Sequence, residues 1–209
     1  HRRGPLASVV NGRRRCCLGA RPRAGPAQRP GHRGNLRPVS RFVITGFPRS
    51  GHAWLANYLY KGQSVVSHEG ARFYWQAGAS YRQAHVHALQ ELTGDCSSTW
   101  MLYPELLATV PRVVLIDRPQ EVSMRRWDRA TEGLSLNGDK LYALLAEGYQ
   151  KILAQQPLVI PYEESYSVGT VERICRYIRE DCDLRRLSLL RNTRVTQDVP
   201  REYQRVMSG

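Results

Sequence analysis

A turn flanked by two glycines carries the residues of this chain that are best suited to binding an anion. It reads Gly46-Phe-Pro-Arg-Ser-Gly51 and follows residues 42–45, a short apolar and β-branched run that predicts a buried strand. Apolar residues then recur at helical spacing over residues 54–59. Between a strand and a helix N-terminus, backbone N–H groups converge on one point and bind phosphate or sulfate. The sequence therefore predicts phosphate or sulfate chemistry at this turn.

The two residues after the turn argue against one kind of phosphate chemistry. The spacing G-x-x-x-x-G is that of a P-loop, and it has the required strand before it and helix after it. A nucleotide triphosphatase then needs a lysine for the β- and γ-phosphates and a hydroxyl group that holds Mg²⁺. Here the two positions are His52, at best a neutral donor, and Ala53, which cannot bind a metal. We therefore expect a metal-free anion site rather than ATP hydrolysis.

Alternating strands and helices have to position this turn. Further strands are predicted by the apolar runs at residues 64–69, 112–117 and 157–161, and a strand edge or loop at 92–99. Helices are predicted by apolar spacing at residues 100–110, 120–130, 140–155 and 168–178, with a polar helix before residue 91. This order predicts a three-layer α/β/α fold with a mostly parallel sheet, the P-loop (nucleoside triphosphate hydrolase-like) fold.

Charge is distributed unevenly along the 209 residues. Residues 1–40 hold ten arginines and no acidic residue, so the formal net charge of +13 leaves only +3 for residues 41–209. We expect residues 1–38, rich in Arg, Gly and Pro, to be disordered. Translated sequence upstream of the native start is the favoured explanation, ahead of a transit peptide or an arm that binds nucleic acid or membrane. A sulfate- or phosphate-binding domain is predicted at 39–183, and a basic, irregular tail at 184–209.

Cysteine and histidine usage indicates a cytoplasmic protein without a metal site. The five cysteines are odd in number and form no C-x-x-C pair, which is typical of reduced thiols. His85 and His87 lie two residues apart and so do not share a helix face, and no metal is expected. No apolar run approaches the roughly 20 residues of a membrane helix. We expect neither a membrane partner nor a specific nucleic-acid partner.

The turn and three later segments resemble the sulfotransferase family, whose loop reads Pro-Lys/Arg-Ser-Gly-Thr-x-Trp-Leu. Pro48-Arg-Ser-Gly-His-Ala-Trp-Leu55 is similar to that loop except at His52 and Ala53. The later segments follow in the family's order, at residues 94–99, 113–123 and 158–164. The resemblance covers roughly residues 40–180. It implies transfer of a sulfuryl group from 3′-phosphoadenylyl sulfate (PAPS) to a hydroxyl or amine of a small-molecule or carbohydrate acceptor, without a metal.

The resemblance also implies roles for individual residues. Arg49 and the backbone N–H groups after it stabilise the charge that develops on the leaving phosphate oxygen. The acceptor must lose a proton, and in members that use a glutamate it lies at the end of the second strand, where Glu69 and His68 stand here. We expect Glu69 to be the base, with His68 as the second choice. The donor-binding residues implied at the loop are Pro48, Arg49, Ser50, Gly51, His52, Ala53 and Trp54.

The pattern that binds the 3′-phosphate of the donor is altered in this chain. The family has Arg-x-Pro and, six residues after the proline, a serine. Here Asp117 occupies the arginine position with Arg118 beside it, and Arg125 occupies the serine position with Ser123 two residues earlier. We expect a shifted set of cations, Arg118 with Arg125 or Arg126, to bind the dianion together with Ser123.

Two other function classes stay open. A P-loop phosphotransferase or nucleotide kinase needs an acid that binds a metal, and Asp117 at a strand end is its candidate. A non-catalytic nucleotide- or nucleic-acid-binding protein is indicated by the Arg-rich N-terminal segment and by the altered 3′-phosphate pattern at Asp117 and Arg125. Cys96, which replaces a lysine of the family, also weakens the donor assignment. The acceptor and the oligomeric state carry no readable signal in the sequence.

Overall fold

The structure, a computed structural model, describes residues 41–61, 66–130 and 138–191. The predictions for residues 1–38 and 192–209 therefore lie outside the described residues. Among the residues described, no helix has the length and apolar character that crossing a membrane requires.

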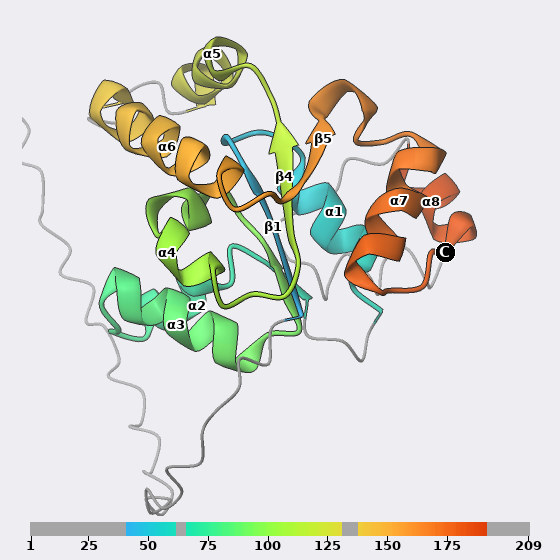
Figure 1. The fold of residues 1–209 in the computed structure, drawn as a ribbon, viewed down its shortest axis with the longest axis horizontal. Coiled ribbons are helices and arrows are strands. Elements are labelled where there is room, and N and C mark those ends of the chain that lie inside the picture. The colour runs from blue at the N-terminus through green and yellow to red at the C-terminus, as the bar shows by residue number, and fades with distance from the viewer. Residues whose placement is uncertain (1–40, 62–65, 131–137, 192–209) are drawn as a thin grey trace, which may run out of the picture. The chain divides into compact units, whose positions relative to one another are not determined.

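Five strands form one parallel sheet in the order β2-β3-β1-β4-β5 (Figure 1). Because all neighbours are parallel, the carboxyl ends of the strands lie at one edge of the sheet, with the end of β1 in the middle. The predicted α/β fold with a parallel sheet is confirmed. The strands are β1 Phe42–Gly46, β2 Val66–His68, β3 Gly94–Cys96, β4 Val113–Asp117 and β5 Leu158–Pro161.

Helices cover both faces of the sheet, as Figure 1 shows. Side chains alternate along a strand, so Phe42 and Ile44 of β1 pack with α1, α7 and α8, whereas Val43 packs with α3, α4 and α6. The result is the predicted three-layer arrangement. The helices are α1 His52–Leu59, α2 Ala71–Gln76, α3 Tyr81–Glu91, α4 Pro104–Leu107, α5 Gln120–Ala130, α6 Gly138–Leu153, α7 Val168–Ile178 and α8 Leu184–Arg191, with 3₁₀ turns η1 Ser98–Leu102 and η2 Tyr162–Glu164.

Close contact between β1 and β4 sets where the glycine turn begins. Gly46 has a φ of 150°, and a Cβ at this position would lie 2.4 Å from the carbonyl oxygen of Ile116. Only glycine fits this approach. The turn therefore starts at the carboxyl end of β1, in close contact with its neighbour β4.

The elements observed around β3 and α4 differ from those predicted. Residues 100–110, predicted as one helix, are divided between η1 and α4 at Tyr103-Pro104. Proline has no N–H and disfavours helical geometry in the residue before it, and Tyr103 has a φ of −136°. Residues 94–96, predicted as a strand edge or loop, are the strand β3, paired on both sides.

Residues 184–191 form helix α8, where an irregular tail was predicted. Leu187 and Leu190 of this helix are buried in the core that α1 also lines. The Arg186 guanidinium donates hydrogen bonds to the backbone carbonyls of Asn57 and Tyr60 at the end of α1. The folded domain therefore extends past the boundary predicted at residue 183.

Candidate anion-binding site

The turn between β1 and α1 has an unusual backbone. Arg49 and Gly51 both lie in the left-handed region, with φ of 68° and 82°. This region costs a residue with a Cβ about 1–2 kcal/mol, so the surroundings must impose it on Arg49. Gly51 precedes the first residue of α1, and a Cβ there would lie 2.2 Å from the hydroxyl oxygen of Tyr166. The Arg49 side chain is exposed, whereas Ser50 is fully buried.

Two residues from the β4–α5 region hold the turn in this shape. The Ser123 hydroxyl donates a hydrogen bond to the carbonyl of Pro48, and the Arg118 guanidinium donates to the carbonyl of Arg49. Both side chains are buried. Arg118 also lies 4.0 Å above the centre of the Tyr162 ring, a cation–π contact. The structure thus brings the predicted Arg118 and Ser123 to the turn, although their binding to a 3′-phosphate stays a prediction.

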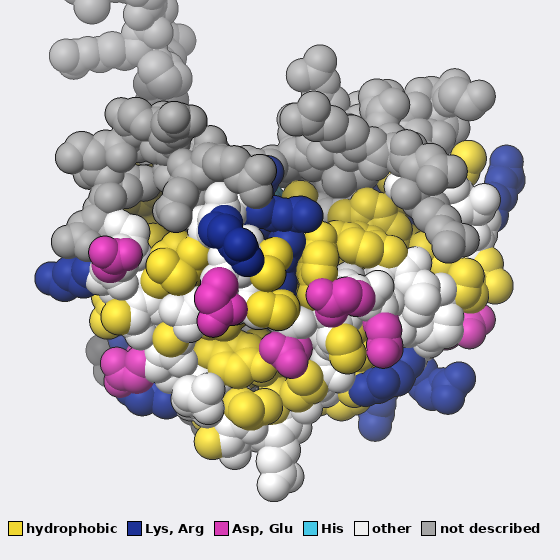
Figure 2. Space-filling view, turned by 90° about the horizontal axis from the view of Figure 1, so that it is seen from above, with side chains coloured by type: hydrophobic (Ala, Val, Ile, Leu, Met, Phe, Trp, Pro, Cys, Tyr) yellow, Lys and Arg dark blue, Asp and Glu magenta, His cyan; other side chains and the backbone are white. Residues whose placement is uncertain are grey.

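The remaining predicted cations lie on exposed positions of α5. Arg125 donates from Nε to the Glu121 carbonyl of its own helix at 3.3 Å. Burial lowers the pKa of Arg118, and the charge of Arg126 lowers it further. Burial raises the pKa of Tyr166, and the charge of Arg126 opposes this increase. Arg126 therefore lies close to the turn. Figure 2 shows Lys and Arg side chains gathered near the middle of this face, with Asp and Glu side chains beside them.

His52 is buried and neutral. Its side chain is 5 % exposed. Burial, followed by the proximity of His68, lowers its pKa to about 3, and a hydrogen bond with the Thr45 backbone offsets this only in part. His52 therefore cannot supply the positive charge of a P-loop lysine at neutral pH.

Four buried polar atoms around the turn have no hydrogen-bond partner among the described residues. Leaving such a group unsatisfied costs about 1–3 kcal/mol. Each is therefore an atom that a bound oxyanion or acceptor group could satisfy. They are Thr45 Oγ1, Ser50 Oγ, His52 Nε2 and His68 Nδ1.

The two predicted bases lie together at the end of β2 but in different surroundings. His68 is mostly buried and close to His52; burial lowers its pKa, and the charge of Glu69 opposes this. Glu69 adopts a left-handed φ of 56°, and its carboxylate lies 4.0 Å from the guanidinium of Arg72. Burial, and after it the charge of Glu69, raises the pKa of Tyr81 on α3. His68 therefore lies near His52 of α1, whereas the Glu69 carboxylate lies beside Arg72 of α2, and the choice of base stays a prediction.

Two residues near the site were missed from the sequence. Tyr166 packs edge-on against Trp54, with ring centres 5.0 Å apart. Its hydroxyl lies next to Gly51, in the space that a Cβ there would need. Burial raises its pKa to about 12, so it is a neutral donor. Asp95 is a buried acid in β3. The paired tyrosines in Tyr162-Glu-Glu-Ser-Tyr166 and an acid inside a short strand were the available signals.

Asp117 and Cys96 occupy the ends of the strands on either side of β1. The Asp117 carboxylate is exposed and accepts a hydrogen bond of 2.9 Å from the Tyr149 hydroxyl. Cys96 is fully buried, and burial raises its pKa well above the usual value, so it stays a neutral thiol. Cys96 stands where the sulfotransferase pattern has a lysine, and a neutral thiol supplies no positive charge there. In the described part of the chain, no group of three or more His, Cys, Asp or Glu side chains is arranged to hold a metal.

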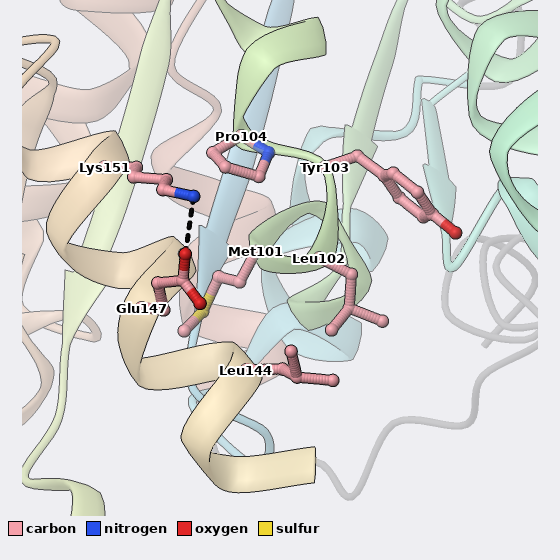
Figure 3. Close-up of a pocket in the computed structure, with 8 residues that line it drawn as sticks. Met101, Leu102, Tyr103, Pro104, Leu144, Glu147 and Lys151 are labelled. Atoms are coloured by element: carbon pink, nitrogen blue, oxygen red, sulfur yellow. Dashed lines mark hydrogen bonds and ion pairs between the residues drawn. The ribbon is translucent and has the colours of Figure 1, made fainter. Parts of the chain in front are cut away.

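A separate pocket of about 310 Å³ lies between η1 and α6 (Figure 3). Lys151 and Glu147 form an ion pair of 2.6 Å on the α6 side, and Tyr103 points away from them. The residues that line this pocket include none of those predicted for the anion site. It is therefore a different feature of the surface.

Comparison with known proteins leaves the family open. No protein-family model and no curated protein matches the chain. Among solved structures, the chain is similar to a shikimate kinase from Bacteroides thetaiotaomicron, with 13% sequence identity and a TM-score of 0.44. The match covers 67% of this chain and 98% of the kinase. A similarity this distant carries no information about activity.

Proposed function

We propose that this chain is a transferase that moves a sulfuryl group from PAPS to a hydroxyl or amine of a small-molecule or carbohydrate acceptor. The observation that carries the proposal is the pair of residues after the turn. His52 is neutral because it is buried, and Ala53 presents a methyl group where a triphosphatase holds Mg²⁺. Backbone N–H groups and an arginine suit a donor that reacts without a metal.

The residues of the turn then have distinct tasks. When bound, PAPS supplies the sulfuryl group and a phosphate leaving group. The exposed Arg49 guanidinium stabilises negative charge at that phosphate, and the Thr45 and Ser50 hydroxyls donate the hydrogen bonds that they do not make within the described residues. Glu69, or His68, accepts the proton that the acceptor loses.

Arg118 and Arg126 are the proposed partners of the 3′-phosphate. Arg118 already donates to the Arg49 carbonyl, but its buried Nε–H has no hydrogen-bond partner among the described residues. Arg126 is exposed on the same side and its charge reaches Arg118. Two cations close to each other suit a dianion, and Ser123, on the same helix as Arg126, donates a hydrogen bond to the turn.

The second candidate is a P-loop phosphotransferase or nucleotide kinase. Asp117 favours it, because an exposed carboxylate at the end of β4, next to the strand that enters the turn, can bind Mg²⁺. The similarity to a shikimate kinase is too distant to decide between the two candidates.

Calorimetric titrations test these candidates directly. Adenosine 3′,5′-bisphosphate is compared with ATP plus Mg²⁺, using wild type, Arg49→Ala and the control Arg82→Ala, an exposed arginine of α3 paired with Glu105. We expect metal-independent bisphosphate binding that Arg49→Ala weakens at least about tenfold, since hydrogen bonds to charged groups contribute about 1.5–3 kcal/mol. Preference for ATP that requires Mg²⁺ and is lost in Asp117→Asn would refute the sulfotransferase proposal. Bisphosphate binding without any transfer would favour a non-catalytic nucleotide-binding protein.

The proposed cytoplasmic location rests on the cysteine usage of the sequence. The five cysteines are odd in number and form no C-x-x-C pair, which is typical of reduced thiols.

A further inference from the structure

The buried carboxylate of Asp95 connects the turn that carries Glu69 to η1. Its Oδ1 accepts the Gly70 N–H at 2.9 Å, and its Oδ2 accepts the Trp100 Nε1–H at 2.7 Å. The side chain is 1 % exposed. Each carboxylate oxygen thus has its own donor, and each donor comes from a different segment.

The contact with Gly70 acts on the backbone of Glu69. Glu69 is left-handed, a conformation that a residue with a Cβ rarely adopts unless its neighbours impose it. Its own N–H donates to the Cys96 carbonyl at 3.3 Å, and the next N–H, that of Gly70, donates to Asp95. Both peptide groups around Glu69 are therefore bound to β3.

Packing leaves this turn little freedom to take another shape. A Cβ on Gly70 would lie 2.3 Å from Leu92 Cδ1 and 3.2 Å from Asp95 Oδ1. Trp100, the second partner of Asp95, is fully buried. One oxygen of Asp95 is thus fixed by Trp100 in the core, and the other accepts from the Gly70 N–H of the turn.

We propose that Asp95 is a positioning residue for the acceptor base: it fixes the left-handed turn so that the Glu69 carboxylate stays at the carboxyl edge of the sheet. This inference rests on the proposed function, in which Glu69 accepts the acceptor's proton. Asp95 itself touches no substrate, because it is buried beneath Gly70. Its effect on transfer therefore passes through Glu69 alone.

Amide hydrogen exchange tests the structural part without any substrate. In Asp95→Ala we expect exchange of the Gly70 amide to be at least about tenfold faster than in wild type, because its buried hydrogen-bond acceptor is lost. The control is Asp183→Asn, since Asp183 Oδ1 accepts the Arg186 N–H at 3.0 Å on another helix; this variant leaves Gly70 unchanged. If the alanine variant does not fold, Asp95→Leu decides, because leucine is of similar size and has no atom that can accept the Gly70 N–H. Unchanged Gly70 exchange overturns the proposal.

Double-mutant kinetics test the functional part. We expect Asp95→Ala to lower kcat about 10²-fold, the cost of a misplaced group, and to leave the Kd for adenosine 3′,5′-bisphosphate unchanged. Adding it to Glu69→Gln lowers kcat no further, because both changes remove the same interaction. Additive losses overturn the proposal. If wild type transfers no sulfuryl group, the proposed function fails, and Gly70 exchange still decides whether Asp95 fixes the turn.

Discussion

Replacing His52 with asparagine is expected to remove a large part of the acid sensitivity of the fold. In the folded protein the pKa of His52 is lowered from 6.5 to about 3, chiefly by burial. Below pH 6.5 the His52 side chain is therefore protonated in the unfolded chain but stays neutral in the folded protein. Protons thus favour the unfolded state, and the free energy of unfolding falls as the pH decreases. Between pH 7.5 and pH 5, a group with these two pKa values lowers the free energy of unfolding by about 2 kcal/mol.

Urea unfolding at pH 7.5 and pH 5 measures this difference. Asparagine does not titrate, and its side-chain amide can still donate to the Thr45 backbone. We expect the decrease in the free energy of unfolding between the two pH values to be about 2 kcal/mol smaller in His52→Asn than in wild type. His87→Asn, on an exposed position of α3, is the control and leaves the decrease unchanged. Equal decreases in wild type and His52→Asn would show that His52 is not held neutral by burial, and would remove the main argument against a charged P-loop.

Two further predictions concern the turn and helix α8. Gly51→Ala is expected to lower the free energy of unfolding by more than the roughly 1–2 kcal/mol of a left-handed residue, because the new methyl also meets the Tyr166 hydroxyl. Gly169→Ala, where a Cβ meets nothing within 4 Å, is the control, and a comparable loss there would contradict this reasoning. Arg186→Ala is expected to cost about 1.5–3 kcal/mol in chemical denaturation, since it removes charged hydrogen bonds to the end of α1. Arg185→Ala, at an exposed neighbouring position, should leave the free energy of unfolding nearly unchanged. Equal losses in the two variants would refute the stabilisation of α1 by Arg186 of α8.

Much of the fold followed from local pattern. The strands β1 and β4 are continuous apolar runs, and α7 buries residues at helical spacing, so each element is encoded within a few neighbouring residues. In contrast, β3 is three residues long and contains Asp95; it is a strand because β1 and β2 pair with it from both sides. Helix α8 was missed for a related reason, since its two buried leucines stand among basic residues.

The turn was predictable from residue types, because glycine spacing, a preceding strand and a following helix are local properties. The same is true of Ala53, whose methyl group cannot bind a metal in any fold. The sequence by itself thus determined that a glycine turn joins a strand to a helix and that no metal ligand stands at Ala53, while anion binding at this turn stays a prediction.

Only the tertiary structure decided which side chains meet at that turn and in which charge state. Arg118 and Ser123 reach the carbonyls of Arg49 and Pro48 across separations of 69 and 75 residues. His52 is neutral because of burial, and Asp95 of β3 accepts a hydrogen bond from the Gly70 N–H, which follows β2. Desolvation and hydrogen bonding depend on the groups packed around an atom in space, and residue spacing along the chain does not specify them.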